Sequence, residues 1–316
     1  GVNFLYLQSP YFANGPLDDQ GDVYLTCEDW DRVFTVTRQD VAYAQSLYHQ
    51  YGQMIPLSLL PKSIREWPGA GNPYFFDRKG RNVVLDSTIP LAPFQDIDGD
   101  NLYDPTKGDV PLVKGDHMAW WTYHLQYPAN RLDNLARAHL QINATTYAVE
   151  PIDDSTLVSF HELEIIPRTT SYDSLVVGLY LDVELGQGSF DNYLGFDTTQ
   201  YMGFAYHKPG LGDYYQSYPP WVGIQGLRTT LGTDTLSNPF GLFRFVVNGF
   251  VYSITELQRG IDLWRILTGY YKDGTPMGAT GPSGSAVDYQ FPGNPGDSTN
   301  QATACRSSAY GLDARM

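Results

Sequence analysis

The sequence predicts a mainly β fold: an antiparallel β-sandwich-like body with one or two short helices and long loops. The chain of 316 residues is rich in aromatic side chains (Tyr 24, Phe 15, Trp 6) and in Gly (31) and Pro (21). This composition is typical of short strands joined by tight turns. Two segments also alternate apolar and polar residues, and an Asn-Gly dipeptide separates two apolar runs, as in a β-hairpin.

The alternation is clearest in residues 136–144 and 175–185. In the first segment apolar Leu140 and Ile142 alternate with polar residues, which is the period of a strand with one buried face. Such strands need a second sheet or helices over the apolar face, which favours a sandwich-like body. Further predicted strands are 157–166, 201–206 and a hairpin over 243–252 that turns at Asn248-Gly249.

Two helices are predicted from their N-terminal capping residues. Thr37 and Asp40 form a capping-box pattern, and apolar residues at helical spacing continue to Gly52. Ser253 and Glu256 repeat the pattern before a helix that ends near Gly269, and residues 63–67 are expected to form one further helical turn.

The same patterns divide the chain into four parts. Residues 1–95 are expected to be an irregular N-terminal segment with one helix, packed on the body, and 96–116 an acidic calcium loop. Residues 117–272 form the predicted β-rich body. Residues 273–316, rich in Gly, Pro and Ser, are expected to form a loop or tail.

The acidic loop carries six aspartates with only two lysines to offset them: Asp96, Asp98, Asp100, Asp104, Asp109 and Asp116, against Lys107 and Lys114. Oxygen ligands at alternate positions around a glycine suit calcium, which takes six to eight oxygens. The backbone carbonyl of Leu102 is a further expected ligand, and Asp104 would bind directly or through water. Lys107 stands where an EF-hand-like loop has its glutamate, so Asp109 or Asp116 must complete the shell. The alternative is a solvated loop of Asx turns.

A second acidic group surrounds the glycine-containing segment 186–195 and is a weaker calcium candidate: Asp182, Glu184, Asp191 and Asp197. The alternative is a solvated strand face and loop.

Charge and hydropathy exclude two classes of partner. With Asp+Glu 35 against Lys+Arg 20, the net charge is -15 and the pI about 4.6, so the chain repels phosphate backbones and anionic lipid. We expect no nucleic acid as a partner. No apolar run approaches the roughly 20 residues of a membrane-spanning helix, so no membrane insertion is expected. The N-terminus lacks a signal-peptide pattern, which is expected of a mature chain or a fragment.

The sequence contains no assigned catalytic motif. The nucleophile elbow G-x-S-x-G, the P-loop and H-E-x-x-H are all absent, and His161 is expected to be an ordinary strand residue. Two carboxylates facing a cleft suffice for a glycosidase, so carbohydrate cleavage stays open. Aromatic rings that could stack on a glycan, or simply pack in the core, are Trp120, Trp121, Tyr214, Tyr215, Tyr218 and Trp221.

The acidic loop continues into a longer motif, D-x-D-G-D-x-x-Y-x-P-x-x-G-D-x-P-x-x-K-G-D-x-x-x-W-W, over residues 96–121. It resembles a segment of large surface proteins that Bacteroidetes-type bacteria export through the type IX secretion system. The likeness continues in order through 27–41, 60–75, 179–206, 219–225, 270–278 and 291–295. The resemblance implies secretion and a place outside the cell or on its outer surface, and it supplies no mechanism.

Cys27 and Cys305 are the only cysteines. In an exported protein two distant cysteines are expected to form a disulfide, here joining the two ends of the chain. The alternative is two buried thiols.

The expected function is that of a secreted, calcium-stabilised structural or adhesive cell-surface protein with no active site. Its expected partners are other copies of itself or other surface proteins, with the aromatic N-terminal stretch 1–12 docked on a neighbour in an extracellular assembly. The alternative is an exported carbohydrate-binding or carbohydrate-cleaving protein whose partner is a glycan.

Overall fold

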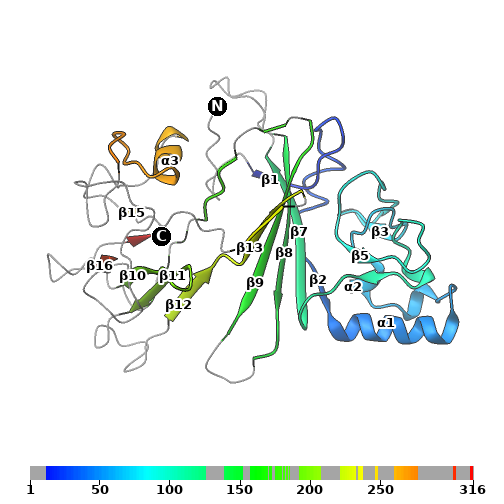
Figure 1. Ribbon diagram of the computed structural model, residues 1–316. Coiled ribbons are helices and arrows are strands. Elements are labelled where there is room, and N and C mark those ends of the chain that lie inside the picture. The colour runs from blue at the N-terminus through cyan, green and yellow to red at the C-terminus, as the bar shows by residue number, and fades with distance from the viewer. Residues whose placement is uncertain are drawn as a thin grey trace. The chain divides into compact units, whose positions relative to one another are not determined.

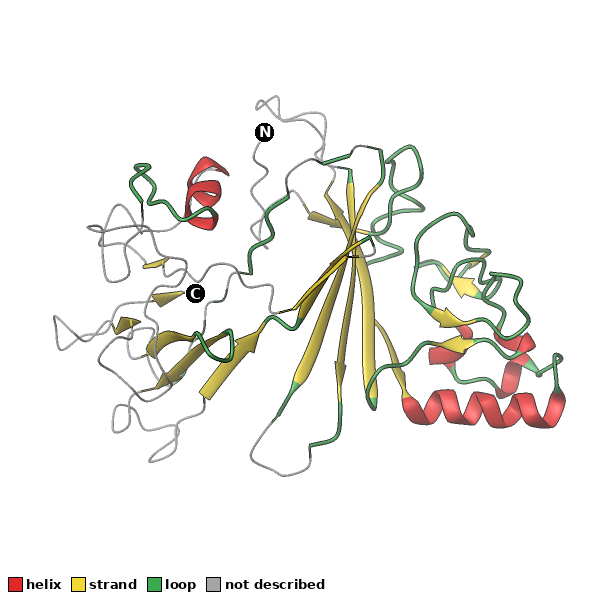
Figure 2. Ribbon diagram, in the orientation of Figure 1, coloured by secondary structure: helices red, strands yellow, loops and turns green. Residues whose placement is uncertain are grey.

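The computed structural model describes residues 12–125, 139–151, 157–169, 171–207, 221–237, 246–247, 260–276, 302–303 and 314–315, with short gaps at 173–174, 180, 182, 184, 186–191 and 233 (Figure 1). The chain forms two compact units, residues 3–173 and 174–316. Strands dominate both units, and every strand pair in the described residues is antiparallel (Figure 2). The predicted mainly β, sandwich-like fold class is confirmed.

A five-stranded sheet forms the centre of the first unit. Its long strands are β7 (His117–Leu125), β8 (Leu140–Ala148) and β9 (Ser159–Pro167), paired in that order. Two short strands, β1 (Phe12–Asn14) and β2 (Phe34–Thr37), pair with the other edge of β7. Within the described residues the sheet therefore ends at β9 on one side.

Helix α1 (Arg38–Tyr51) follows β2 and confirms the predicted helix. The Thr37 hydroxyl accepts from the Asp40 backbone N–H at 3.1 Å, and the Asp40 carboxylate accepts from the Thr37 N–H at 3.2 Å. The helix buries Val41, Ala44 and Leu47 and stops at Gly52. The local capping chemistry therefore sets where this helix begins.

The main core of the first unit lies between α1, the loops after it and one end of the sheet. It includes the short helix α2 (Lys62–Arg65), the 3₁₀ turn η1 (Leu57–Leu59) and the pair β3 (Phe75–Phe76) and β4 (Asn82–Val83). Its largest buried side chains are Trp30, Phe34, Ile64, Trp67, Phe75, Leu85, Tyr103, Met118 and Trp120. Apolar residues from Trp30 to Trp120 thus form one core, which fixes the loops onto the sheet.

Strand β8 confirms the predicted strand at 136–144 from residue 140 onward, since 136–138 lie outside the described residues. The expectation that one of its faces is exposed is wrong, because Gln141 and Asn143 are 0% and 4% exposed. The Gln141 amide donates to the Pro90 carbonyl at 2.6 Å and accepts from the Leu17 N–H at 3.0 Å. The Thr122 hydroxyl donates to Asn143 at 2.9 Å. Loops that bring their own hydrogen-bonding groups therefore cover the polar face.

In its described residues, the second unit contains a four-stranded sheet and two smaller strand pairs. The four-stranded sheet runs in the order β12 (Trp221–Gln225), β11 (Met202–His207), β10 (Asn192–Asp197) and β16 (Ala302–Thr303). Its inner strands bury Leu194, Phe196, Phe204 and Ala205. The remaining elements are the pairs β13 (Arg228–Leu231) with β14 (Asp234–Ser237) and β15 (Val246–Val247) with β17 (Ala314–Arg315), and helix α3 (Gly260–Leu267).

Other strand predictions have mixed outcomes. Strands β9 and β11 confirm those at 157–166 and 201–206, and His161 is an ordinary strand residue of β9. The strand predicted at 175–185 is wrong for its described residues, 175–179, 181, 183 and 185, which belong to no strand. Alternation gives a segment an apolar side, but a strand also requires a neighbour for its backbone hydrogen bonds.

Two predictions fall on residues outside the description: the Asn248-Gly249 turn and the helix start at Ser253. Helix α3 begins within the described part at Gly260. In the described ranges, no helix is both long and apolar enough to span a bilayer.

Candidate metal site

A pair of short strands closes the acidic loop. Strand β5 (Phe94–Gln95) pairs with β6 (Val110–Pro111), and Gln95 lies opposite Val110. Asp96 and Asp109 directly follow and precede these paired residues, so the two ends of the loop meet. A sequence separation of thirteen positions is thereby reduced to a contact distance.

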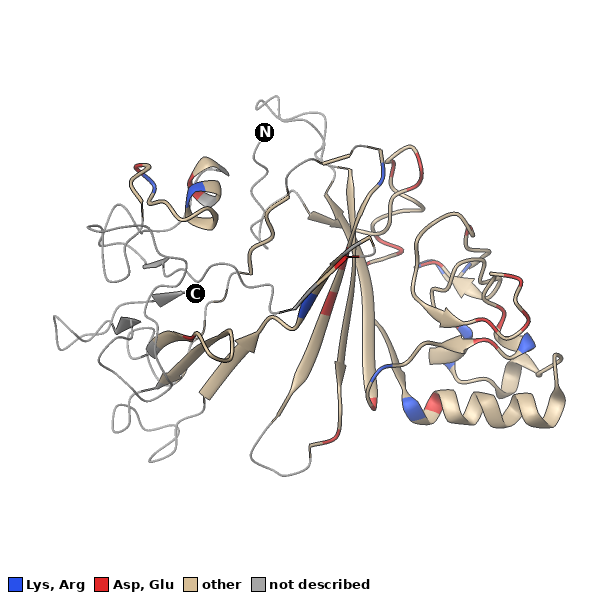
Figure 3. Cartoon of the chain, viewed as in Figure 1, with Lys and Arg blue, Asp and Glu red and all other residues tan. Residues whose placement is uncertain are grey.

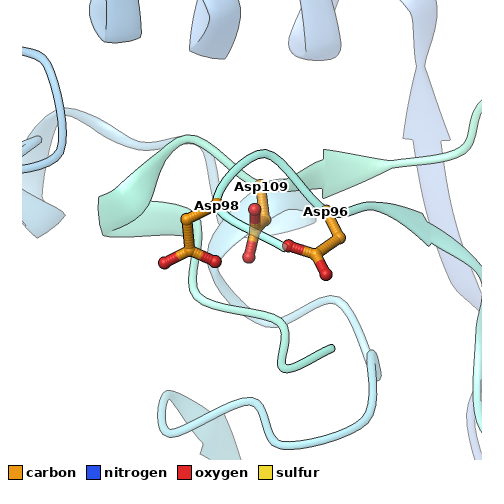
Figure 4. Close-up of side chains that lie close together, drawn as sticks. All are labelled: Asp96, Asp98 and Asp109. Atoms are coloured by element: carbon orange, nitrogen blue, oxygen red, sulfur yellow. The ribbon is translucent and has the colours of Figure 1, made fainter. Parts of the chain in front are cut away.

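Three carboxylates of this loop converge. Asp96, Asp98 and Asp109 each offer one oxygen, and these oxygens lie within 4.8 Å of one another. Figure 4 shows the three side chains side by side under the loop backbone. Calcium binds oxygens at about 2.3–2.6 Å, so two ligands of one ion lie no more than about 5 Å apart. The spacing therefore fits a single calcium ion.

Backbone hydrogen bonds hold the loop in its turn. The Asp96 carboxylate accepts from the N–H groups of Gly99 at 2.7 Å and Asn101 at 2.8 Å. Gly99 and Asn101 have φ values of 77° and 62°, the left-handed region that glycine and asparagine tolerate best. A Cβ on Gly99 would meet no atom within 4 Å, so the backbone angle, and not a lack of space, favours glycine there.

Asp109 is the buried member of the group, with 0% exposure. Its two oxygens accept from the Ile97 and Asp104 N–H groups, both at 2.8 Å. Burial raises the pKa of Asp109 to about 6, against the lowering effect of these hydrogen bonds, and the charges of Asp96 and Asp98 add to the increase. In the described part of the chain no basic side chain pairs with Asp109. A bound cation would supply the missing counter-charge.

Lys107 compensates a different part of the loop. Its ammonium lies 2.6 Å from an Asp100 oxygen and 3.0 Å from an Asp98 oxygen. These contacts raise the pKa of Lys107, and the hydrogen bond from Lys107 lowers the pKa of Asp100. Asp100 is therefore engaged by lysine, whereas Asp98 lies between lysine and the other two carboxylates.

Tyr103 anchors the loop to the core. This side chain is 0% exposed, and its hydroxyl donates to the Ile64 carbonyl at 2.6 Å. The Tyr103 N–H donates to the Ala70 carbonyl at 2.7 Å, and a Cβ on Gly69 would lie 2.6 Å from the Tyr103 Cβ. Close packing of this kind fixes the loop backbone, and with it the positions of the aspartates.

Two of the remaining predicted ligands, Asp104 and Asp116, have other partners. Leu102 is 39% exposed and its N–H donates to Asp100, so its backbone carbonyl stays a predicted ligand. Asp104 caps the 3₁₀ helix η2 (Pro105–Lys107) by accepting from the Thr106 N–H and hydroxyl. Asp116 pairs with the Arg38 guanidinium at 3.0 Å and accepts from the Glu150 N–H at 2.9 Å. Of the two carboxylates proposed to complete the shell, the structure brings Asp109 to the cluster.

The second acidic group is only partly described. Asp182, Glu184 and Asp191 lie outside the described residues. Asp197 is buried and accepts from the Thr199 hydroxyl at 2.6 Å and from the N–H groups of Thr199 and Gln200, which lowers its pKa. These contacts are those of an Asx turn.

Of the two cysteines, Cys27 has a free, half-buried thiol whose pKa is raised by burial, and Cys305 lies outside the described residues. The Cys27–Cys305 disulfide stays a prediction.

The aromatic residues differ in exposure. Trp120 is 1% exposed, Trp121 is half-buried, and Tyr214, Tyr215 and Tyr218 lie outside the described residues. Trp221 on β12 is 53% exposed and stacks on Tyr206 with ring centroids 4.5 Å apart and planes 13° apart. Among the described rings of this set, Trp221 is therefore the one with an exposed surface.

Sequence reasoning missed the groups that organise the site: the backbone donors of Ile97 and Asp104 and the burial of Asp109. The apolar residues Phe94 and Val110 on either side of the acidic run were the available signal, because two flanking apolar positions can pair and close a loop.

Comparisons with protein families, with curated proteins and with solved structures each find no match for this chain. Acidic residues appear along several loops of the described chain (Figure 3). Asp96, Asp98 and Asp109 are the group in those ranges whose oxygens gather closely enough for one ion.

Proposed function

We propose that the loop 96–109 binds one calcium ion through Asp96, Asp98 and Asp109. The observation that carries this proposal is the convergence of three carboxylate oxygens within 4.8 Å around a buried, uncompensated Asp109. Backbone carbonyls of the loop and water would supply the remaining oxygens that calcium requires.

The ion's role in this proposal is structural. It joins the end of β5, the turn at Asp98 and the start of β6, and this loop is packed into the main core through Tyr103. Calcium would neutralise carboxylates that otherwise repel one another, and would thereby stabilise the folded first unit.

The proposed role of the whole chain is that of a secreted structural or adhesive cell-surface protein, a subunit of an extracellular assembly. The resemblance of residues 96–121 and six further segments to surface proteins of the type IX secretion system supports export. Calcium sites in extracellular modules bind with dissociation constants of about 10⁻⁴–10⁻³ M or tighter, so a stabilising calcium loop suits such a location. The proposed partners are other copies of the chain or other surface proteins.

A calcium-dependent melting experiment tests the site. If the dissociation constant is on the order of 10 μM, about 1 mM calcium should stabilise the fold by roughly 2.7 kcal/mol relative to chelator. Asp98→Ala removes a predicted ligand at the exposed side of the site, and should abolish this difference. Equal melting temperatures in calcium and chelator for the unmodified chain would refute the calcium proposal.

Glycan binding is the second candidate, and the exposed Trp221 favours it. Its ring is held parallel to Tyr206 at 4.5 Å, and a rigid aromatic surface can stack on the apolar face of a sugar. Titration with cellohexaose, followed by calorimetry, should show binding that Trp221→Ala abolishes and Trp264→Ala, also at an exposed tryptophan, leaves intact. Absence of heat with cellohexaose and with chitohexaose would count against this candidate.

A further inference from the structure

In the described part of the chain, strand β9 lies at the edge of the five-stranded sheet. All nine residues from Ser159 to Pro167 pair with β8 on one side, and in the described residues no strand pairs with the other side. Leu157, Val158 and Leu163, at and beside this edge, are 87%, 52% and 53% exposed. Natural proteins usually cover or block long edges, because unpaired N–H and C=O groups beside apolar side chains recruit another strand.

The charges near this edge do not block it. The Glu162 carboxylate pairs with the Lys114 ammonium, and the Glu164 carboxylate accepts from the Asn143 side chain at 3.1 Å, so both interact with their own sheet. A second β9 is nevertheless a poor partner. Antiparallel pairing of two β9 strands about Leu163 would place each Glu162 opposite a Glu164, and like charges in that position are destabilising. The partner strand should therefore be apolar and free of acidic residues.

Residues 175–179 have this chemistry. Their sequence, Leu-Val-Val-Gly-Leu, carries no charge and begins the alternating segment 175–185. They belong to no helix, strand or turn, and Leu175, Val177 and Leu179 are 51%, 60% and 53% exposed. A Cβ on Gly178 would lie 2.5 Å from Leu267 of α3, so this segment is packed against its own unit on one side and exposed on the other. Among the described residues, a strand-like segment and a strand edge thus each lack a strand partner.

Residues 168 and 169, directly after β9, do not turn back onto this edge. The Arg168 N–H donates to the His139 carbonyl at 3.0 Å, which extends the contact with the β8 side of the sheet. The Arg168 guanidinium donates to the Asp18 carbonyl at 3.0 Å, and Thr169 lies against Gly21. These contacts lead the backbone away from the outer edge of β9, toward the loop at residues 18–22.

We propose that residues 175–179 of one copy add as a strand to the outer edge of β9 in a second copy. Main-chain hydrogen bonds would provide the affinity, and the exposed leucine and valine side chains would cover Leu163. One copy contributes residues 175–179 and the other contributes β9, so the contact is heterologous. Each pair therefore leaves one β9 edge and one segment 175–179 unoccupied, and further copies can add to these to form a chain of subunits. The proposal rests on the assembly role described above, and it names the surfaces involved.

Cross-linking of single-cysteine chains tests the contact. In the full-length chain with Cys27→Ser and Cys305→Ser, one preparation carries Leu163→Cys and the other carries a cysteine at 175, 177 or 179. Paired strands bring opposite Cα atoms to about 4.5–5.5 Å, within the range that a disulfide spans. We expect a disulfide-linked dimer from at least one mixed pair under mild oxidation, and none when Met54→Cys, which is 82% exposed in the native chain, replaces Leu163→Cys.

Light scattering provides the second measurement. Leu163→Lys and Val177→Lys should each reduce the scattering mass to that of the 35.4 kDa chain, whereas Met54→Lys should leave the assembly unchanged. Equal melting temperatures would show that the lysine variants are folded. Absence of a disulfide-linked dimer from every mixed pair would overturn the proposal, as would assembly that persists in both folded lysine variants. If the lysine variants still assemble, the assembly role stands and only the proposed surfaces are wrong. If the unmodified chain is stabilised by calcium but stays monomeric, the assembly role is wrong as well.

Discussion

Two aspartates from the same acidic stretch, Asp109 and Asp116, show how position decides what a carboxylate does. Asp109 is fully buried, accepts two backbone N–H groups and has no basic partner in the described chain. The Asp116 side chain is 31% exposed and paired with Arg38, and its pKa is lowered by the hydrogen bond from the Glu150 N–H and by Arg38. The first carboxylate is a proposed calcium ligand without a described counter-charge, whereas the second is paired with a cationic side chain of the same chain.

The largest expected effect comes from removing the buried carboxylate. Asp109→Ala leaves the Ile97 and Asp104 N–H groups without an acceptor, and each unsatisfied buried donor costs about 1–3 kcal/mol, so a loss of roughly 2–6 kcal/mol is expected. Urea unfolding in chelator measures this loss without any contribution from calcium. Asp109→Asn retains one acceptor oxygen and should lose clearly less; equal stability of the Ala variant and the unmodified chain would contradict the anchoring role of Asp109.

The raised pKa of Asp109 predicts an unusual pH dependence. Its folded-state pKa of about 6 lies above the ordinary value of 3.8, so between these values the folded chain holds more protons than the unfolded chain. The Asp109 contribution to the free energy of unfolding therefore falls as pH rises from about 4 to 7, by on the order of 1–3 kcal/mol without calcium.

The carboxylates with lowered pKa values, such as Asp29 and Asp116, act in the opposite direction, because their stabilisation is lost as pH falls. The informative quantity is therefore the difference between the unmodified chain and Asp109→Asn, measured by urea unfolding in chelator at several pH values. A difference that does not change between pH 4 and 7 would show that Asp109 titrates normally.

A smaller effect is expected at the second aspartate. Asp116→Asn weakens the contact between Arg38 at the start of α1 and Asp116, so melting should occur at a lower temperature in both calcium and chelator. The increment produced by calcium should be unchanged, because Asp116 lies outside the cluster. If Asp116→Asn instead removed the stabilisation by calcium, Asp116 would be a calcium ligand like Asp109, and the two aspartates would not differ in role.

The smallest expected effect is at Lys107. Lys107→Met removes the ammonium that contacts Asp98 and Asp100, which makes the loop more negative. We expect slightly lower stability in chelator and tighter calcium binding, two changes of opposite sign that calorimetry and melting curves can separate. Weaker calcium binding in this variant would mean that the lysine helps to assemble the site.

Two segments with the same alternation, 136–144 and 175–185, show the limit of predicting strands from sequence. From Leu140 onward the first is part of a strand paired on both sides, by β7 and β9, whereas the described residues of the second pair with no strand. The alternation describes one segment, but pairing depends on a second segment far away in the chain. Gln141 and Asn143 were expected at the surface for the same reason, since the loops that bury them come from residues 17 and 90.

Local interactions are what the sequence by itself determined. The Thr37–Asp40 capping box and the spacing of Val41, Ala44 and Leu47 specify α1 within a few turns of the chain, and the aspartates around Gly99 specify an acidic turn. Such features depend on neighbours three or four positions away, which a sequence displays directly.

Only the tertiary structure decided which aspartates meet. The pairing of β5 with β6 brings Asp109 to Asp96 and Asp98, while Arg38, more than seventy positions earlier, binds Asp116. The burial of Asp109 depends on a core assembled from α1, α2 and the sheet. Burial and charge compensation depend on which residues surround a side chain in the fold. Those residues come from distant parts of the chain, so their positions in the sequence do not reveal them.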